Sequence, residues 1–171
     1  MTARLLLLAL AAGATLAATT ASAAPERPAA AKITAAGVDG IKLGASFTSL
    51  RKAHKISKAV RGCELAGPKA RSAALLGLLR GFVDLTQTTP HKVQTIVVLG
   101  GAKARGVGIG AKFAAIRAAF PGTKLDHTTD KTFLISIAHV KKSAGGPISF
   151  AVSTKTHKVT QIGIPNLSFC E

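Results

Sequence analysis

The sequence lacks the aromatic residues on which many binding proteins rely. It contains no Trp and no Tyr, and its seven Phe residues lie mostly at positions typical of a protein core. Proteins that bind single-stranded nucleic acids stack the bases on aromatic side chains, so we do not expect a nucleic-acid partner. Contacts to a phosphate backbone without stacking stay open as an alternative.

Acidic residues are also scarce. The 171 residues include seven Asp and Glu, and the sequence has no G-x-S-x-G motif of a nucleophile elbow. One cluster combines carboxylates and imidazoles, namely Asp126, His127, Asp130 and His139. We interpret it as a polar loop, LDHTTDK, and expect no enzymatic activity, metal or cofactor. The alternative is a small secreted hydrolase that uses Asp126, His127 or His139.

Basic residues, in contrast, are abundant. The chain has 23 Lys and Arg residues and a formal net charge of +16 at pH 7. Such an excess attracts polyanions, so we predict an acidic protein or an anionic envelope polymer as the partner. A basic surface that serves only solubility is the alternative. If the predicted strands align, their charged turns form a basic loop edge of His91, Lys92, Lys141, Lys142, Lys155, His157 and Lys158.

The first 23 residues have the features of a secretory signal peptide. Arg4 precedes an apolar run over 5–18, and Ala21 and Ala23 have the A-x-A spacing that signal peptidase recognises. Thr and Ser interrupt the run within the roughly 20 apolar residues that a membrane anchor needs. We therefore predict cleavage before Ala24 and a secreted or extracytoplasmic protein whose mature chain has no transmembrane segment.

Two cysteines remain in the predicted mature chain, Cys63 and Cys170. Because an even number of cysteines in an oxidising compartment favours disulfide formation, we predict that they pair with each other. Two cysteines so far apart, without neighbouring histidines, lack the spacing of a zinc site. The predicted bond would tie the C-terminus to the first half of the chain.

The chain repeats itself with an offset of 66 residues. Residues 40–54 read GIKLGASFTSLRKAH and residues 106–120 read GVGIGAKFAAIRAAF, with six identities in 15 positions. The segment 91–98 matches 157–164 at the same offset, and this shared register indicates duplication. The predicted segments are a signal peptide (1–23), a flexible lead-in (24–36), repeat 1 (37–102) and repeat 2 (103–171).

Glycine-rich turns precede the predicted helix in both copies. Free amides at the start of a helix attract phosphate, but the spacing fits neither the dinucleotide fingerprint nor the G-x-x-x-x-G-K loop. The middle glycine of GVGIG is also replaced in GIKLG. A ligand role for the recurring arginines is the alternative to a scaffold role. We interpret the recurring residues as scaffold, namely Gly40, Gly44, Phe47, Arg51, Gly106, Gly110, Phe113 and Arg117.

Apolar periodicity predicts a short helix and three strands in each copy. Phe47 and Leu50 have the spacing of a helix face, as do Phe113 and Ile116. Alternation then predicts strands over FLISIAHV, ISFAVS and VTQIGI in the second copy and over VQTIVVL in the first, where LLGLL (75–79) fits a strand or a helix. We predict an α+β fold in which each copy is a short helix followed by an antiparallel three-stranded meander, with both copies packed as one domain.

These motifs resemble those of bacterial envelope proteins. The pattern G-(I/V)-x-(L/I)-G-A-x-F-x-x-(L/I)-R, with a meander ending in K-V-x-x-I, is similar to the duplicated α/β repeats of the β-lactamase inhibitory protein fold and to small lipoproteins of the SmpA/OmlA type. It also resembles secreted bacterial proteins with cysteines at the places of Cys63 and Cys170. The resemblance covers residues 37–171 and implies a non-catalytic module that binds a protein through a sheet face, without assigning binding residues. We therefore predict a secreted, non-catalytic binding protein of the bacterial envelope or exterior.

Overall fold

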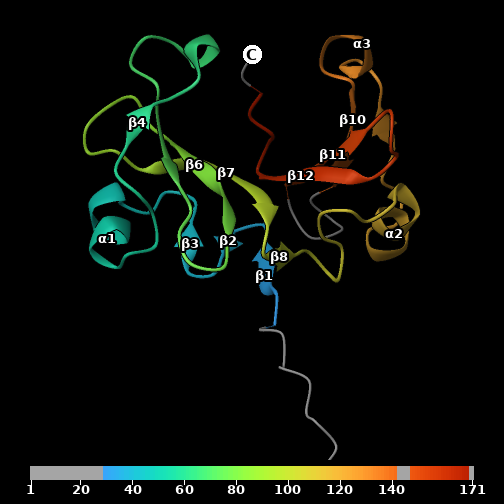
Figure 1. The fold of residues 1–171 in the computed structure, drawn as a ribbon, viewed down its shortest axis with the longest axis horizontal. Coiled ribbons are helices and arrows are strands. Elements are labelled where there is room, and N and C mark those ends of the chain that lie inside the picture. Colours follow the sequence, from blue (N-terminus) through green and yellow to red (C-terminus); the bar gives the residue numbers. More distant parts are fainter. Residues whose placement is uncertain (1–28, 142–146, 170–171) are drawn as a thin grey trace, which may run out of the picture.

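Much of the chain alternates apolar and polar residues with a period of two, and it folds accordingly into β-sheets (Figure 1). The computed structural model describes residues 29–141 and 147–169. The predicted signal peptide, Lys142 and Cys170 lie outside the described residues.

The larger of two sheets has eight antiparallel strands. In spatial order they are β4 (Val60–Arg61), β5 (Arg71–Ala74), β6 (Arg80–Leu85), β7 (Val93–Gly100), β12 (Val159–Ile164), β11 (Ile148–Ser153), β10 (Ile135–Val140) and β9 (Leu125–Asp126). The two central strands, β7 and β12, come from different halves of the chain. The sheet therefore runs without a break from one half into the other.

The smaller sheet has four short strands. Their order is β3 (Ile41–Lys42), β2 (Gly37–Val38), β1 (Ala31–Thr34) and β8 (Ala102–Lys103). β1 runs antiparallel to β2 and parallel to β8. Because β1 falls within residues 24–36, part of the predicted lead-in is a paired strand that ties the start of the described chain to its middle.

The helical segments are all short. They are α1 (Phe47–Lys52), the 3-10 turn η1 (Glu64–Ala66), α2 (Phe113–Ala119) and α3 (Asp130–Phe133). α2 ends before Pro121, because proline disfavours the helical conformation in the residue that precedes it. Leu50 of α1 and Ile116 of α2 are buried, so each of the two longer helices anchors itself with one apolar side chain.

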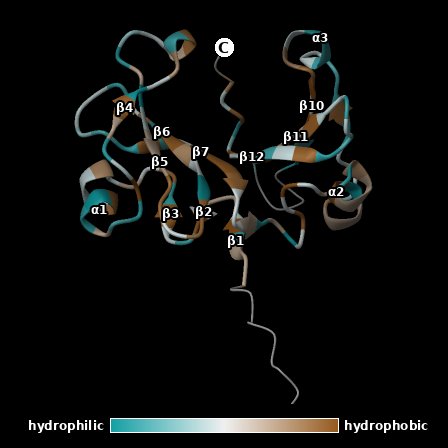
Figure 2. Ribbon diagram, in the orientation of Figure 1, coloured by the Kyte–Doolittle hydropathy of each residue, from teal (hydrophilic) through white to brown (hydrophobic). Residues whose placement is uncertain are grey.

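A single cluster of buried side chains joins α1 and α2 to both sheets. Ile33 and Ile41 reach this core from the small sheet, and Ile116 reaches it from α2. Ile96 and Phe150 belong to the large sheet and are fully buried. In Figure 1, the small sheet, α1 and α2 lie on the lower side of the large sheet, and Figure 2 shows brown apolar residues along its central strands. One face of the large sheet therefore forms most of the core.

The contact between β7 and β12 is symmetric. The opposing residues are Val97 and Gly163, Ile96 and Ile164, and Val98 and Ile162. Gly163 is the equivalent of Val97 at the repeat offset of 66 residues. Exchange of the two halves therefore maps the Val97–Gly163 pair onto itself and interchanges the other two pairs. A pseudo-two-fold axis therefore passes through the Val97–Gly163 pair. The strand order β4-β5-β6-β7 in one half is matched by β9-β10-β11-β12 in the other.

The predicted α+β fold, with a helix and a three-stranded meander in each copy, is wrong. The described residues form a mostly β structure with 12 strands in two sheets. Each half adds four strands to the large sheet, because β4 and β9 form edge strands of two residues each. Two residues are too few for an alternating pattern to be recognised in a sequence.

The ambiguous LLGLL segment is the turn between β5 and β6. Gly77 has a φ of 77°, a left-handed conformation that glycine adopts without strain. Leu76 and Leu78 are 40% and 69% exposed. The turn is apolar in composition although part of it faces solvent, which is why its periodicity fitted both a strand and a helix.

Candidate functional site

The glycine turns of both halves are closed by internal hydrogen bonds. The amide of Gly44 donates to the carbonyl oxygen of Val93 at 2.7 Å, and that of Gly110 donates to Val159 at 2.8 Å. Gly44 and Gly110 have φ values of 77° and 84°, which a side chain would strain. Because these amides are already bonded, they are not available to hold a phosphate. These two hydrogen bonds tie each turn to the first residue of β7 or β12.

The residues of the predicted basic loop edge do not meet at one place. Lys92 pairs with Ser46 at the start of α1, and Lys158 pairs with Lys112 at the start of α2. Since β7 and β12 are antiparallel, their first residues lie at opposite ends of the central strand pair. The other described members are His91 beside Lys92, Lys155 and His157 beside Lys158, and Lys141 after β10.

A cationic hollow lies beside α2. It has a volume of about 460 Å³ and is lined by Phe113, Arg117, Gly122, Thr123, Lys124, Leu125 and His127. Arg117 and Lys124 are positively charged, His127 becomes so when protonated, and no lining residue is acidic. We call this feature the α2 hollow. Its charge and its partly apolar lining suit an anionic group on a larger molecule better than a free metal ion.

The basic residues of the α2 hollow recur in the first half at the offset of 66. The corresponding pairs are Arg51 and Arg117, Lys58 and Lys124, Arg61 and His127, Phe47 and Phe113, and Ser57 and Thr123. We refer to Arg51, Lys58 and Arg61 together as the α1 cluster, a name that rests on their equivalent positions in the repeat. One position differs in kind, because Gly122 corresponds to Ile56, whose side chain is fully buried.

A contact between a basic and an acidic side chain also recurs at the same offset. Arg61 Nη2 lies 3.4 Å from Glu64 Oε1, and His127 Nδ1 lies 2.8 Å from Asp130 Oδ2. Each pair joins residues three apart and links the end of an edge strand to a one-turn helix, η1 or α3. The two outer edges of the large sheet therefore share local geometry as well as charge.

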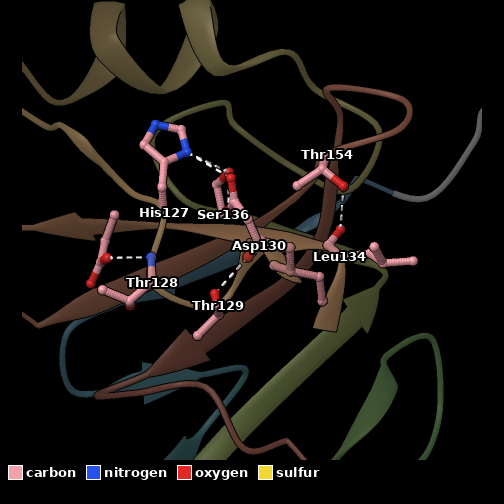
Figure 3. Close-up of polar contacts among 9 residues, drawn as sticks. His127, Thr128, Thr129, Asp130, Leu134, Ser136 and Thr154 are labelled. Carbon is pink, nitrogen blue, oxygen red and sulfur yellow. Dashed lines mark hydrogen bonds and ion pairs between the residues drawn. The ribbon is translucent and has the colours of Figure 1, made fainter. Parts of the chain in front are cut away.

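Asp130 also belongs to a triangle with His127 and Ser136 (Figure 3). The Ser136 hydroxyl donates to Asp130 Oδ1 at 2.8 Å and lies 3.2 Å from His127 Nδ1. In a nucleophilic triad, the histidine accepts the serine proton with one ring nitrogen and contacts the carboxylate with the other. Here the serine proton points to the carboxylate, and a single ring nitrogen faces both partners. The arrangement lacks the geometry of a triad.

The triangle instead fixes the ionisation of Asp130. The hydrogen bond from Ser136, and secondarily the contact with His127, lower the pKa of Asp130 below its ordinary value. The pKa of Asp126 is also lowered, chiefly because the backbone amide of Thr128 donates to its carboxylate at 2.9 Å. Both carboxylates are therefore anionic near neutral pH and hold the loop before β10 in place.

His139 does not join this triangle. Its Nδ1 lies 3.0 Å from the hydroxyl of Ser149, which in turn is 3.3 Å from the carbonyl oxygen of Pro165. Asp126 pairs with Ile137 across β9 and β10. His127 and His139 of the alternative hydrolase prediction therefore hydrogen-bond to different partners, while the Asp126 carboxylate is held by the Thr128 amide and interacts electrostatically with both imidazoles.

The face of the large sheet opposite the core carries the C-terminal segment. Gly163 lies directly beneath it, because a Cβ on this residue would be 2.2 Å from the carbonyl oxygen of Asn166. The rings of Phe133 and Phe169 stack with centroids 5.1 Å apart. Cys63 Sγ lies 3.3 Å from the carbonyl oxygen of Phe169. The residue before Cys170 is therefore beside Cys63, and their predicted disulfide, which involves a residue outside the described ranges, stays a prediction.

A search with family models, among curated proteins and among solved structures finds no match to this chain. The resemblance to envelope proteins given above therefore stays a prediction. Within residues 29–141 and 147–169, no three metal-binding side chains are grouped as a metal site would require. The helices of the same residues are all too short or too polar to cross a bilayer.

Most residues of the α2 hollow were not predicted from the sequence. Arg51 and Arg117 were recognised as equivalent, but the residues that directly follow each helix were not compared between the two copies. When the comparison at the same offset is continued to residue 127, Lys58 aligns with Lys124 and Arg61 aligns with His127. The signal was therefore present in the sequence, although the fit of these side chains around a hollow depends on the fold.

Proposed function

We propose that this chain is an exported, non-catalytic protein that binds an anionic polymer through its basic surface. The observation that carries the proposal is the shortage of internal partners for its cations. Among the described lysines and arginines, Lys55 and Arg61 are the ones within 4.0 Å of a described carboxylate. The remaining positive charge is free to attract an external polyanion.

The carboxylates within the described ranges are engaged inside the molecule. Asp39 pairs with Lys55, Glu64 with Arg61 and Asp130 with His127. Asp84 accepts a hydrogen bond from the hydroxyl of Ser72 at 2.6 Å, and Asp126 accepts one from the Thr128 amide. These internal contacts therefore neutralise little of the positive charge. Most of the net charge of the chain remains available to an external partner.

A polymer fits this charge distribution better than a single acidic protein. Protein interfaces concentrate their binding energy in buried Trp, Tyr and Arg side chains, and this chain has no Trp or Tyr. Its basic turns are separated at opposite ends of the central strands, as described above. A flexible polyanion can contact several separate basic sites, because its binding depends on how many charges it neutralises.

Binding of long-chain polyphosphate, followed by fluorescence anisotropy over a range of NaCl concentrations, tests the proposal. The protein used is the exported, oxidised chain. We expect binding whose logarithmic affinity falls linearly with the logarithm of salt concentration, as counterion release requires. Absence of binding, or affinity that does not depend on salt, would contradict the proposal.

The same samples test the non-catalytic part of the proposal. After prolonged incubation, polyphosphate recovered from the mixture is compared by gel electrophoresis with polymer incubated alone. We expect identical length distributions. Shortening of the polymer would instead support the alternative of a secreted hydrolase, and substitution of His127 or His139 would then show which polar network is responsible.

A further inference from the structure

We infer that the α1 cluster and the α2 hollow are a matched pair of sites for the phosphate groups of one linear polymer. The inference rests on the proposed function and specifies where the polymer binds. It predicts that these two sites contribute far more than equally basic, exposed residues elsewhere on the protein.

The matching of the two sites is structural as well as sequential. α1 and α2 begin at Phe47 and Phe113, which are 66 residues apart. The contacts of Arg61 and His127, each with a carboxylate three residues later, are separated by the same offset. The helix that bears each recurring arginine and the edge strand that bears each recurring contact are therefore placed alike in both halves.

The chemistry of both sites suits phosphate. Arg51 and Arg117 lie in the last turns of their helices, and a guanidinium group offers a fork of donors that matches phosphate oxygens. Lys58 and Lys124 add a second, compact positive charge. The pairs with Glu64 and Asp130 engage the neighbouring side chains at Arg61 and His127, and neither carboxylate lines the α2 hollow.

The spacing of the sites suits a polymer rather than a small anion. The α1 cluster adjoins edge strand β4 and the α2 hollow adjoins edge strand β9, at the two ends of the large sheet. Figure 1 shows α1 and α2 at the left and right extremes of the molecule, both on the lower side of the sheet. Seven strand spacings separate the edges, or roughly 34 Å before twist is considered. A long chain can bridge this distance, whereas a triphosphate can occupy one site at a time.

Charge-removing variants at each site test the inference. Arg51→Gln with Lys58→Gln alters the α1 cluster, and Arg117→Gln with Lys124→Gln alters the α2 hollow. The matched control is Arg80→Gln with Lys103→Gln, which removes one arginine and one lysine that are exposed and belong to neither site. All three variants lose the same formal charge. Circular dichroism and urea unfolding establish that each is folded.

Titration with tripolyphosphate and with long-chain polyphosphate separates site binding from bridging. We expect the unmodified protein to bind the long chain at least about 100-fold more tightly than tripolyphosphate, because a tethered second contact is intramolecular. Either site variant should lower long-chain affinity at least about tenfold and reduce the slope of its salt dependence by about 2. The control should change affinity by less than about threefold.

Two results would overturn the inference and leave the proposed function standing. One is an equal loss of affinity in the control, which would mean that overall charge and no particular site determines binding. The other is a long-chain advantage that persists in a site variant, which would mean that the two sites are not bridged. Failure of the unmodified protein to bind polyphosphate would instead remove the proposed function, and the inference with it.

Discussion

The two halves of the chain place the same charges beside their outer strands but support them differently. In the first half, the side chains of Arg61 and Glu64 are 71% and 78% exposed, so solvent screens their interaction. In the second half, Asp130 is 29% exposed and also accepts a hydrogen bond from the buried Ser136. The second site is therefore held more firmly before any ligand arrives.

The residue that follows each helix explains a second difference. Ile56 inserts a fully buried side chain in the first half, whereas Gly122 at the corresponding position has a φ of 80° and would meet no atom within 4 Å if it carried a Cβ. The absent side chain leaves space beside α2. Both halves thus carry the equivalent cations. The position after the helix is filled by a buried side chain in the first half and is open in the second.

The largest expected effect concerns the helices that position these sites. Leu50 and Ile116 are equivalent, and they are 7% and 0% exposed. Truncation of either to Ala should lower the free energy of unfolding by about 2–5 kcal/mol, through lost apolar burial and the cavity left behind. Ile116→Ala should cost more, because its side chain is fully enclosed. Urea unfolding measures both, with exposed Thr48→Ala as a control, and a cost as small as that of the control would contradict the shared core.

The predicted disulfide has no equivalent in the second half, because the residue that corresponds to Cys63 at the repeat offset is Thr129. Cys63→Ser should lower the free energy of unfolding by about 2–4 kcal/mol, since the cross-link limits the unfolded chain. Mass spectrometry of the intact exported protein should detect no free thiol until a reductant is added. Reductant should destabilise the original protein but leave the variant unchanged, and titratable thiols in the oxidised protein would disprove the pairing.

Gly163 and Val97 are equivalent residues that face each other at the pseudo-two-fold axis, yet a Cβ fits at Val97 alone. Gly163→Ala should cost about 1–3 kcal/mol, because its Cβ would collide with backbone atoms of Asn166 and displace the C-terminal segment. Nuclear Overhauser contacts between the rings of Phe133 and Phe169 should weaken. Gly122→Ala, where the added Cβ meets open space, should preserve them. Unchanged ring contacts in the Gly163 variant would show that the segment does not cross there.

The smallest expected effect concerns the pKa of Asp130. Ser136→Ala removes the main hydrogen bond that lowers this pKa, so the pKa should rise toward its ordinary value near 3.8. A lowered folded-state pKa stabilises the fold above the unfolded pKa, and this contribution disappears as pH falls through the folded pKa. Loss of Ser136 should therefore reduce stability at neutral pH but hardly at all in strong acid. Carbon NMR titration measures the pKa values of the carboxyl groups directly. Asp126, which is held by Thr128, serves as the control whose pKa should be the same in the variant and in the original protein.

The sequence allowed prediction of the elements whose patterns are long enough to recognise. Alternation over 148–153 and 159–164 identified β11 and β12, and the apolar spacing from Phe47 and Phe113 located the two main helices. The two-residue edge strands and the small sheet have no comparable periodicity, and they change the fold class from α+β to mostly β.

The basic loop edge was beyond sequence reasoning for a different reason. Whether Lys92 and Lys158 lie together depends on how β7 meets β12, and this contact is decided by the packing of the whole core. The α2 hollow was partly accessible, because Arg117 and Lys124 have equivalents at the repeat offset. Its connection to Asp130 and Ser136 depends on side-chain hydrogen bonds that no spacing rule describes.

The symmetric seam between β7 and β12 has a consequence for each half of the chain taken alone. Residues 29–100 alone would leave residues 96–98 of β7 without the partners that β12 provides, although Val93 would keep its backbone hydrogen bonds to Gly44 and Ala45. The partner best suited to cover that edge is another copy of the same half, joined as β7 is now joined to β12. A protein made of one such half would therefore pair with a second copy across β7, whereas in the present chain the two halves are joined covalently and each outer edge carries its own side chains.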